Sequence, residues 1–259
     1  MNAADPWSWY TEIPIVSRIY LTASFLTTAA CALDIVSPYS LYFNVTLIFG
    51  KGQIWRILTN FFFFGLFSLD FLFHMYFLVR YCRLLEEGEF RGRTADFVWF
   101  LLVGGTLMTM AAPFVSVLFL GSSLTFMMVY VWGRLNQHVR MSFLGLFPFT
   151  APYLPWVLLL FSVLLGHSPA VDVIGIVVGH LYYFFEFVFP EVARIRRWRV
   201  KRVLAAPSFL HRLCGTYTDH NQPQVLNDFA EAQAQQNEDA PNNGFNVADG
   251  GQNGHLHQE

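Results

Sequence analysis

Three ionisable side chains lie within one long apolar stretch of the sequence. Asp172, His180 and Glu186 fall between Pro169 and Pro190, and His74 lies in a second apolar stretch. Ionisable groups at membrane depth are costly, so those that occur usually pair with one another or mark a functional site. Two carboxylates and two imidazoles could couple ion movement, act as acid and base, or line a polar cavity.

A pair of glycines lies in the same stretch, four residues apart, at Gly175 and Gly179. Residues four apart share one face of a helix, and glycine lets a neighbouring helix approach closely. About 20 residues are enough to cross a bilayer core. We therefore expect Pro169–Pro190 to be a membrane helix that packs through its glycine face.

Two serines, Ser122 and Ser123, could act as nucleophiles if a neutral imidazole lay within reach. His180 is the histidine that could be imagined in this role. It directly follows Gly179, however, so its side chain points about 100° away from the glycine face. We favour a hydrogen-bonding histidine inside the bundle, and an intramembrane serine protease that pairs Ser122 or Ser123 with His180 is the alternative.

The sequence predicts neither a metal nor a cofactor. No His, Cys or Asp cluster has the spacing of a metal site, and no glycine-rich loop follows a strand. The three cysteines, Cys31, Cys82 and Cys214, are odd in number, so a disulfide framework is not expected. We also expect no nucleic-acid partner.

The composition is that of a polytopic membrane protein, and we expect an all-α fold. Of the 259 residues, 54% are hydrophobic, 18% aromatic and only 13% charged. No cleavable signal peptide is predicted at the N-terminus. Six spans are expected at about Ser17–Val36, Leu69–Tyr81, Phe97–Phe114, Val117–Trp132, Tyr153–Leu165 and Pro169–Pro190.

The segment that follows the first span, residues 37–65, is apolar but is interrupted by a proline and by glycines. Irregular backbone at membrane depth is tolerated only where protein or a water cavity covers it. We therefore expect a half-inserted loop. In this loop Trp55 and Arg56 fit an interfacial anchor, with tryptophan at headgroup level and arginine on lipid phosphate.

The two ends of the chain differ in character from the membrane domain at 17–190. Residues 1–16 mix aromatic residues with acids, as in an interfacial segment. Residues 191–217 carry a basic juxtamembrane cluster suited to anionic headgroups, and the polar tail at 218–259 is expected to be disordered. The basic loops fall on one side of a six-span arrangement, so both termini are expected in the cytosol.

Two of the expected spans, the second and the fifth, are short. About 13 apolar residues give roughly 20 Å of helix, against a hydrocarbon core of about 30 Å. Such a shortfall is relieved by local thinning of the bilayer. We therefore expect the protein to perturb its membrane. The sequence also contains one glycosylation sequon, at Asn44, which its apolar surroundings predict to be unused.

Several motifs together resemble the rhomboid superfamily and, more closely, the Derlin family. The rhomboid-like features are Gln53-Ile54-Trp55-Arg56, Tyr130-Val131-Trp132 and the Gly175/Gly179 pair. The Derlin-like features are the runs LEEGEFRGRTADF at 85–97 and PYLPWV at 152–157. The resemblance covers about residues 8–210 and implies a six-helix rhomboid-like bundle. It also implies that the Trp55-Arg56 loop lies beside a substrate entrance.

The resemblance also poses a chemical question, because rhomboid proteases use a serine and a histidine. Their histidine lies three residues before the glycine pair, where this chain has Asp172, and a carboxylate cannot replace the imidazole base. Their serine lies in a Gly-x-Ser-Gly turn, whereas this chain has Leu124 at the second glycine. Alignment on Tyr-Val-Trp places Gly121 at the nucleophile. We therefore expect no catalytic residues and no enzyme activity.

The implied function is a non-proteolytic part of endoplasmic-reticulum-associated degradation, in which misfolded proteins are recognised and returned to the cytosol through a locally thinned membrane. The implied partners are misfolded clients, a membrane ubiquitin ligase complex, a cytosolic AAA ATPase, the lipid bilayer, and further copies or relatives of the chain. The box by which some Derlin tails bind the ATPase is matched only loosely, from Phe245 onward. A small-solute transporter that couples through Asp172, Glu186 and His74 is a further alternative.

Overall fold

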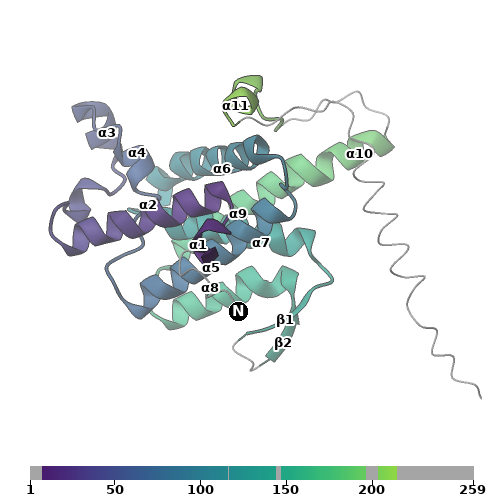
Figure 1. Ribbon diagram of the computed structural model, residues 1–259, viewed down its shortest axis with the longest axis horizontal. Helices are drawn as coiled ribbons and strands as arrows, with labels where there is room; N and C mark the ends of the chain where they lie inside the picture. The colour runs from purple at the N-terminus through teal and green to yellow at the C-terminus, as the bar shows by residue number, and fades with distance from the viewer. Residues whose placement is uncertain (1–7, 116, 144–146, 197–203, 215–259) are drawn as a thin grey trace, which may run out of the picture. The chain divides into compact units, whose positions relative to one another are not determined.

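The computed structural model of the 259-residue chain describes residues 8–115, 117–143, 147–196 and 204–214. These residues are mostly helical, as Figure 1 shows. The principal helices are α2 (Ile15–Ala32), α5 (Leu69–Glu87), α6 (Thr94–Val115), α7 (Gly121–Leu135), α8 (Leu154–Leu164) and α9 (Pro169–Tyr183).

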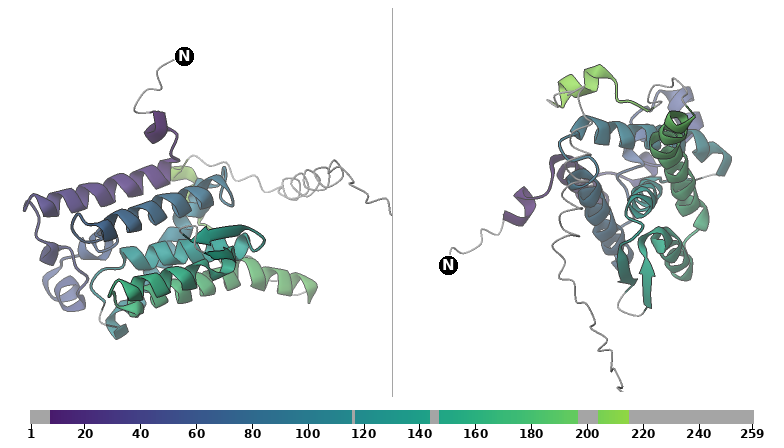
Figure 2. Two further views of the ribbon diagram at one scale, coloured as in Figure 1. Left: turned by 90° about the horizontal axis from the view of Figure 1, so that it is seen from below. Right: turned by 90° about the vertical axis from the view of Figure 1, so that its right-hand side faces the viewer.

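Helix α7 forms the centre of the bundle. All its residues from Ser123 to Gly133 are buried, and apolar residues of α7 occur on every face of the helix, as is typical of a helix enclosed by others. Helices α5, α6, α8 and α9 all pack against it, and α7 and α9 form the most extensive pair. The α7 and α9 ribbons lie side by side in the views of Figure 2. Helix α2 packs on the outer side of α5.

Three helices within the described residues are long and apolar enough to cross a membrane. They are α2, α6 and the continuous helical stretch Pro169–Ile195, and the segment Ala151–Leu164 is a shorter apolar helix. The protein is therefore a multi-pass membrane protein with a mostly helical fold, as the sequence predicts. The six-span count stays a prediction.

The helix at the second predicted span is longer than that span. The span was predicted to end at Tyr81, but α5 continues to Glu87 and has 19 residues, and the shortness of its membrane-spanning part stays a prediction. The charged end stays helical because Arg83 and Glu87 form an i,i+4 ion pair at 2.9 Å and Glu86 is buried against α2. The helix at the fifth predicted span is short, since α8 and the turn η2 before it cover only Ala151–Leu164.

The fourth helix begins later than predicted, at Gly121 instead of Val117. The residues before it bond to the first loop instead of forming a helical turn: the N–H of Leu120 donates to the Asn60 carbonyl, and the N–H of Phe43 donates to the Leu118 carbonyl. This pairing fixes the start of α7 against the loop.

The sixth helix continues past its predicted end at Pro190. After α9 the chain winds as the π-helix η3 (Phe184–Val188) and then as α10 (Phe189–Ile195). Proline has no N–H to donate to the preceding turn of a helix. The wider π turn directly before Pro190 accommodates this loss without a break in the helix.

The first loop is built from short helical pieces, as expected of a broken segment. They are η1 (Pro38–Ser40), α3 (Val45–Lys51) and α4 (Arg56–Thr59). The Asn44 side chain caps α3 by accepting from the N–H of Leu47 at 3.0 Å, and Gly52 ends α3 with a φ of 65°.

The prediction of an all-α fold missed one small feature. Strands β1 (Arg140–Phe143) and β2 (Phe147–Thr150) form an antiparallel hairpin in which Met141 faces Phe149. The short helices α1 (Ser8–Thr11) and α11 (Ser208–Leu213) lie near the ends of the described chain. The predicted disordered tail, 218–259, and part of the basic cluster, 197–203, lie outside the described residues.

Candidate functional site

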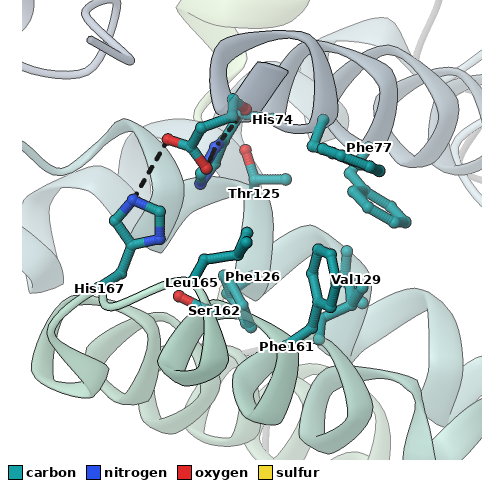
Figure 3. A pocket seen from close by; sticks show the side chains of 12 residues that line it. His74, Phe77, Thr125, Phe126, Val129, Phe161, Ser162, Leu165 and His167 are labelled. Carbon is teal, nitrogen blue, oxygen red and sulfur yellow. Dashed lines mark hydrogen bonds and ion pairs between the residues drawn. The ribbon is translucent and has the colours of Figure 1, made fainter. Parts of the chain in front are cut away.

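A small cavity lies between α5, α7 and α8, and Figure 3 shows it from close by. Its volume is about 40 Å³. A water molecule occupies about 10–15 Å³ on this measure, so the cavity has room for about three waters. Its polar lining residues are Asp70, His74, Thr125, Ser162 and His167.

Asp70 joins two histidines at one side of this cavity. One carboxylate oxygen, Oδ1, lies 3.3 Å from His74 Nδ1, and the other, Oδ2, lies 3.4 Å from His167 Nε2. Figure 3 shows both contacts as dashed lines. Asp70 therefore links α5 to the connection between α8 and α9.

Local structure explains how these three side chains meet. The Ser68 side chain accepts from the N–H of Phe71 at 3.1 Å and so begins α5, which places Asp70 in its first turn and His74 one turn later. At the end of α8 the chain reverses at Gly166, whose φ is 88°. The reversal brings His167 back over the cavity.

Asp172 of α9 is the buried carboxylate of the site. The residue is only 3% exposed. Its carboxylate is near enough to Asp70, His74 and His167 to interact with them electrostatically, and the Ser162 side chain lies beside it. Its second oxygen, Oδ2, is buried without a hydrogen-bond partner among the described residues. His74 and Asp172, two of the four predicted intramembrane polar residues, thus lie near enough to interact electrostatically, although they are on different helices.

One of the two α7 serines, Ser123, has its hydroxyl bound to the backbone. The Ser123 hydroxyl donates to the backbone carbonyl of Val171 at 2.6 Å, a bond that ties α7 to the start of α9. None of the hydrogen bonds formed by the described side chains of His74, His167 and His180 goes to a serine.

His180 lies away from the cavity. Its Nδ1 is 2.7 Å from the hydroxyl of Tyr130, so it is a hydrogen-bonding histidine, but its side chain is exposed on the outside of the bundle and not enclosed within it. It follows Asp172 by eight residues, or about 12 Å along the helix axis. Glu186, which is 8% exposed in η3, lies about 21 Å from Asp172 along the same axis.

The two glycines of α9 face α7 at very close range. A Cβ at Gly175 would overlap the carbonyl oxygen of Ser123 and would lie 2.8 Å from the Cβ of Phe126. A Cβ at Gly179 would lie 3.1 Å from the Cβ of Tyr130. This close approach fixes the first part of α9, which carries Asp172 one turn earlier, against α7.

Trp55 and Arg56 play different parts in the first loop. Arg56 is 5% exposed and donates to the carbonyls of Tyr39 and Tyr42 at 2.9 and 3.0 Å and to Gln53 Oε1 at 2.7 Å. Its guanidinium therefore organises the loop from within, where lipid phosphate does not reach. Trp55 is 51% exposed and is the member of the pair available to the surroundings.

The sequence-based reasoning did not single out Asp70 or His167. The available signal for Asp70 was its i,i+4 spacing to His74 directly after a capping serine. The sequence carried no signal that His167 belongs to the same group, because its loop reaches α5 only through the fold. Within the described chain no group of three or more His, Cys, Asp or Glu side chains could hold a metal ion.

The fold defines a multi-helix membrane protein with a small cavity between helices, and sequence comparison gives the family. Residues 13–198 match the model of the Der1-like family. Derlin-2.2 of Arabidopsis thaliana is 51% identical over 216 residues, which are 79% of this chain and 86% of that protein. Derlin-2 of Oryza sativa is 52% identical over 79% of this chain and 84% of its own length. A probable derlin-2 homolog of Dictyostelium discoideum is 44% identical over 81% and 84%. The chain belongs to the Der1-like family, the Derlins.

Proposed function

We propose that this protein works in endoplasmic-reticulum-associated degradation as a non-proteolytic, rhomboid-like membrane protein. It crosses the membrane of the endoplasmic reticulum six times with both termini in the cytosol, and it helps to recognise misfolded proteins and return them to the cytosol. Membership of the Derlin family supports this role.

The proposal rests on the residues found at the positions where a rhomboid protease has its catalytic serine and histidine. The position of the histidine is taken by Asp172, a buried carboxylate that interacts electrostatically with His74 and His167. The nearby Ser123 hydroxyl is bound to the Val171 carbonyl, and His180 is bound to Tyr130 about 12 Å further along α9. This geometry supports a buried polar group in place of a serine–histidine pair.

The short helix α8 supports a thinned membrane beside the small cavity. With the preceding turn η2 (Ala151–Tyr153), the apolar helix Ala151–Leu164 is about 21 Å long, roughly two-thirds of a 30 Å hydrocarbon core. Its outward side chains, Trp156, Leu160 and Leu164, are exposed and would meet lipid. A bilayer thinned beside α8 lowers the cost of moving a polar client segment past the cavity.

We further propose that the protein acts with a membrane ubiquitin ligase complex and a cytosolic AAA ATPase, and that it assembles with further Derlin chains. The partial match of the tail near Phe245 gives no support to direct ATPase binding. Full-length chain and a chain ending at residue 214 should therefore retain similar amounts of ATPase in a pull-down. A loss of the ATPase with the tail would assign recruitment to the tail.

The experiment that tests the function uses cells from which their own Derlins have been deleted. Expression of the full chain should restore the turnover of a misfolded membrane protein in a cycloheximide chase. A Ser122→Ala, Ser123→Ala double variant should restore it equally, and neither form should react with a serine-directed fluorophosphonate. Labelling that disappears in the double variant, or failure of the wild-type chain to restore turnover, would contradict the proposal.

A further inference from the structure

We infer that a second cavity, bounded by α2, α4, α6 and α7, holds one acyl chain of a bilayer phospholipid. None of its lining residues also lines the small cavity between α5, α7 and α8. The site is independent of the proposed function, because it concerns only how the protein meets its lipid.

The second cavity has a buried floor. Its volume is about 370 Å³, and the helices that form its sides, α2, α4 and α6, lie close together in Figure 1. Tyr20 of α2, Phe61 directly after α4 and Leu124 of α7 line it and are 6%, 8% and 6% exposed. The cavity therefore reaches into the packed interior of the bundle and is more than a shallow groove on its surface.

The rim of this cavity is apolar and exposed. Ile19 of α2, Leu58 of α4 and Met110 of α6 line it and are 61%, 61% and 65% exposed. Helices α2 and α6 are both long and apolar enough to cross a membrane, and they do not pack extensively on each other. The cavity therefore opens between two membrane helices, where the surroundings are the hydrocarbon of the bilayer.

The polar groups that line the cavity are already bonded within the protein. The hydroxyl of Tyr20 donates to the carbonyl of Phe61 at 3.0 Å. The hydroxyls of Thr106 and Thr109 each donate, at 2.7 Å, to the carbonyl four residues earlier in α6. The other lining residues are apolar or glycine. A buried water needs two to four polar partners, so this lining favours a hydrocarbon occupant over water.

Size favours a single hydrocarbon chain over a helix. An apolar cavity of about 150 Å³ binds benzene, which has six carbons, so about 370 Å³ has room for roughly 15 carbons at the same packing. On α6 the lining runs from Leu101 to Met110, about 14 Å along the helix axis. An α-helix is about 10–12 Å across with its side chains, so 14 Å of it needs more than about 1,000 Å³. An acyl chain fits this space, and the helix of a client or of a second copy does not.

The bound chain also has a structural consequence. An empty cavity leaves its lining atoms without contacts on one side, and the loss of stability grows with the cavity volume. The bilayer supplies hydrocarbon at the opening. A chain that enters packs against Ile57 and Leu58 of α4 as well as against α2 and α6. The lipid therefore helps to hold the first loop against two membrane helices.

The test uses the full-length protein in nanodiscs that contain a phosphatidylcholine with a photoreactive diazirine in the middle of one acyl chain. Peptide mass spectrometry after illumination locates the labels. They should concentrate on the lining segments of α2 and α6 and exceed those on the exposed face of α8, which meets only surrounding lipid. The same lipid with the diazirine in its headgroup should not label these segments. Equal labelling of all lipid-facing helices would mean surrounding lipid only and would overturn the inference.

Gly105→Leu tests the site by filling it. A Cβ at Gly105 would lie 3.5 Å from the Phe61 ring, which is an ordinary contact, so a side chain can be added there without moving the backbone. This variant should lower the labelling of the lining to the level found on α8. Gly50→Leu is the matched control and should keep the labelling, because Gly50 lies outside the cavity and nothing lies within 4 Å of an added Cβ.

A second variant covers the case in which Gly105→Leu does not fold. Thr106→Phe fills the cavity from an exposed position of its rim and should lower the labelling in the same way. Labelling of the lining that survives either substitution in a folded protein would show that the chain lies elsewhere.

Competition in detergent micelles identifies the source of the chain. Unlabelled phosphatidylcholine should displace the probe from the lining, whereas oleic acid and cholesterol at the same concentration should displace it less. Stronger displacement by oleic acid would assign the cavity to a free fatty acid, and stronger displacement by cholesterol would assign it to a sterol. Either result refutes the phospholipid.

Hydrogen exchange reports the link to the first loop. Amides of residues 54–62 should exchange more slowly in micelles that contain phosphatidylcholine than after delipidation in the same detergent, because local opening is then less frequent. In Gly105→Leu the exchange should not depend on lipid. Exchange at 54–62 that does not respond to lipid in the wild-type chain would contradict a role of the lipid in holding the loop.

Discussion

Glu86 of α5 accepts hydrogen bonds from both the backbone N–H and the hydroxyl of Ser17 in the first turn of α2, at 2.8 and 2.7 Å. It also accepts from the N–H of Val16 at 3.0 Å. Helix α2 begins after Pro14, which offers no side-chain cap. A buried carboxylate from a distant part of the sequence therefore caps this helix and meets the positive end of its dipole.

Replacement of Glu86 by alanine should lower the free energy of unfolding by about 2 kcal/mol, because three hydrogen bonds to a charged acceptor are lost. Glu86→Gln should lose less, since the amide oxygen can still accept. The control is Glu87→Ala, which removes only an exposed ion pair with Arg83 and should cost below about 0.5 kcal/mol. Thermal unfolding in detergent micelles measures the stability of the three variants. Equal losses of stability in Glu86→Ala and Glu87→Ala would contradict the capping role.

The contact between α7 and α9 predicts a graded response to alanine at three glycines. Gly175→Ala should destabilise the protein by about 2–3 kcal/mol, because its Cβ overlaps the backbone of Ser123. Gly179→Ala, whose Cβ meets its neighbours at 3.1–3.2 Å, should cost less. At Gly50 nothing lies within 4 Å of an added Cβ, so alanine should be neutral or stabilise α3 by up to about 1 kcal/mol. A different order in the unfolding midpoints would rule out this packing explanation.

The sequence was sufficient to predict the helical membrane class and the approximate position of the helices, because long apolar runs and the spacing of glycines are local properties. It misplaced the end of α5, since the charges there are satisfied by α2 and within α5 itself. It also misplaced the start of α7, because residues 117–120 bond to the first loop. These are contacts between distant segments, and no local pattern reports them.

The candidate site was predictable only in part, for the same reason. Asp172 and His74 could be noticed because ionisable residues are rare in apolar stretches. Their meeting, and the addition of Asp70 and His167, depend on the reversal at Gly166 and on the packing of α9 against α7. Arg56 illustrates the opposite case, in which a residue expected at the lipid surface is enclosed by backbone carbonyls of its own loop.

Arg56 should therefore be more important for stability than its neighbours in the loop. Arg56→Ala leaves the carbonyls of Tyr39 and Tyr42 without their donor and should cost about 2–3 kcal/mol. Arg56→Lys should not rescue the loop, because a single ammonium cannot reproduce the fork that reaches both carbonyls and Gln53. The exposed Lys51 is the control, and Lys51→Ala should be nearly neutral. Full rescue by lysine would show that only the charge matters.

The difference in length between α8 and α6 predicts an asymmetric bilayer around the protein. Helix α6 has 22 residues and spans about 33 Å, whereas α8 together with η2, Ala151–Leu164, spans about 21 Å. Exposed apolar side chains on both helices must stay in hydrocarbon, so the bilayer should be thinner beside α8 by several ångströms.

Cryo-electron microscopy in nanodiscs measures the bilayer thickness directly, as the distance between headgroup layers beside each helix. Reconstitution in lipids with shorter chains is the control and should reduce the difference, because less compression is then needed. A bilayer of uniform thickness around the protein in long-chain lipids would remove the physical basis for an easier passage of clients beside α8.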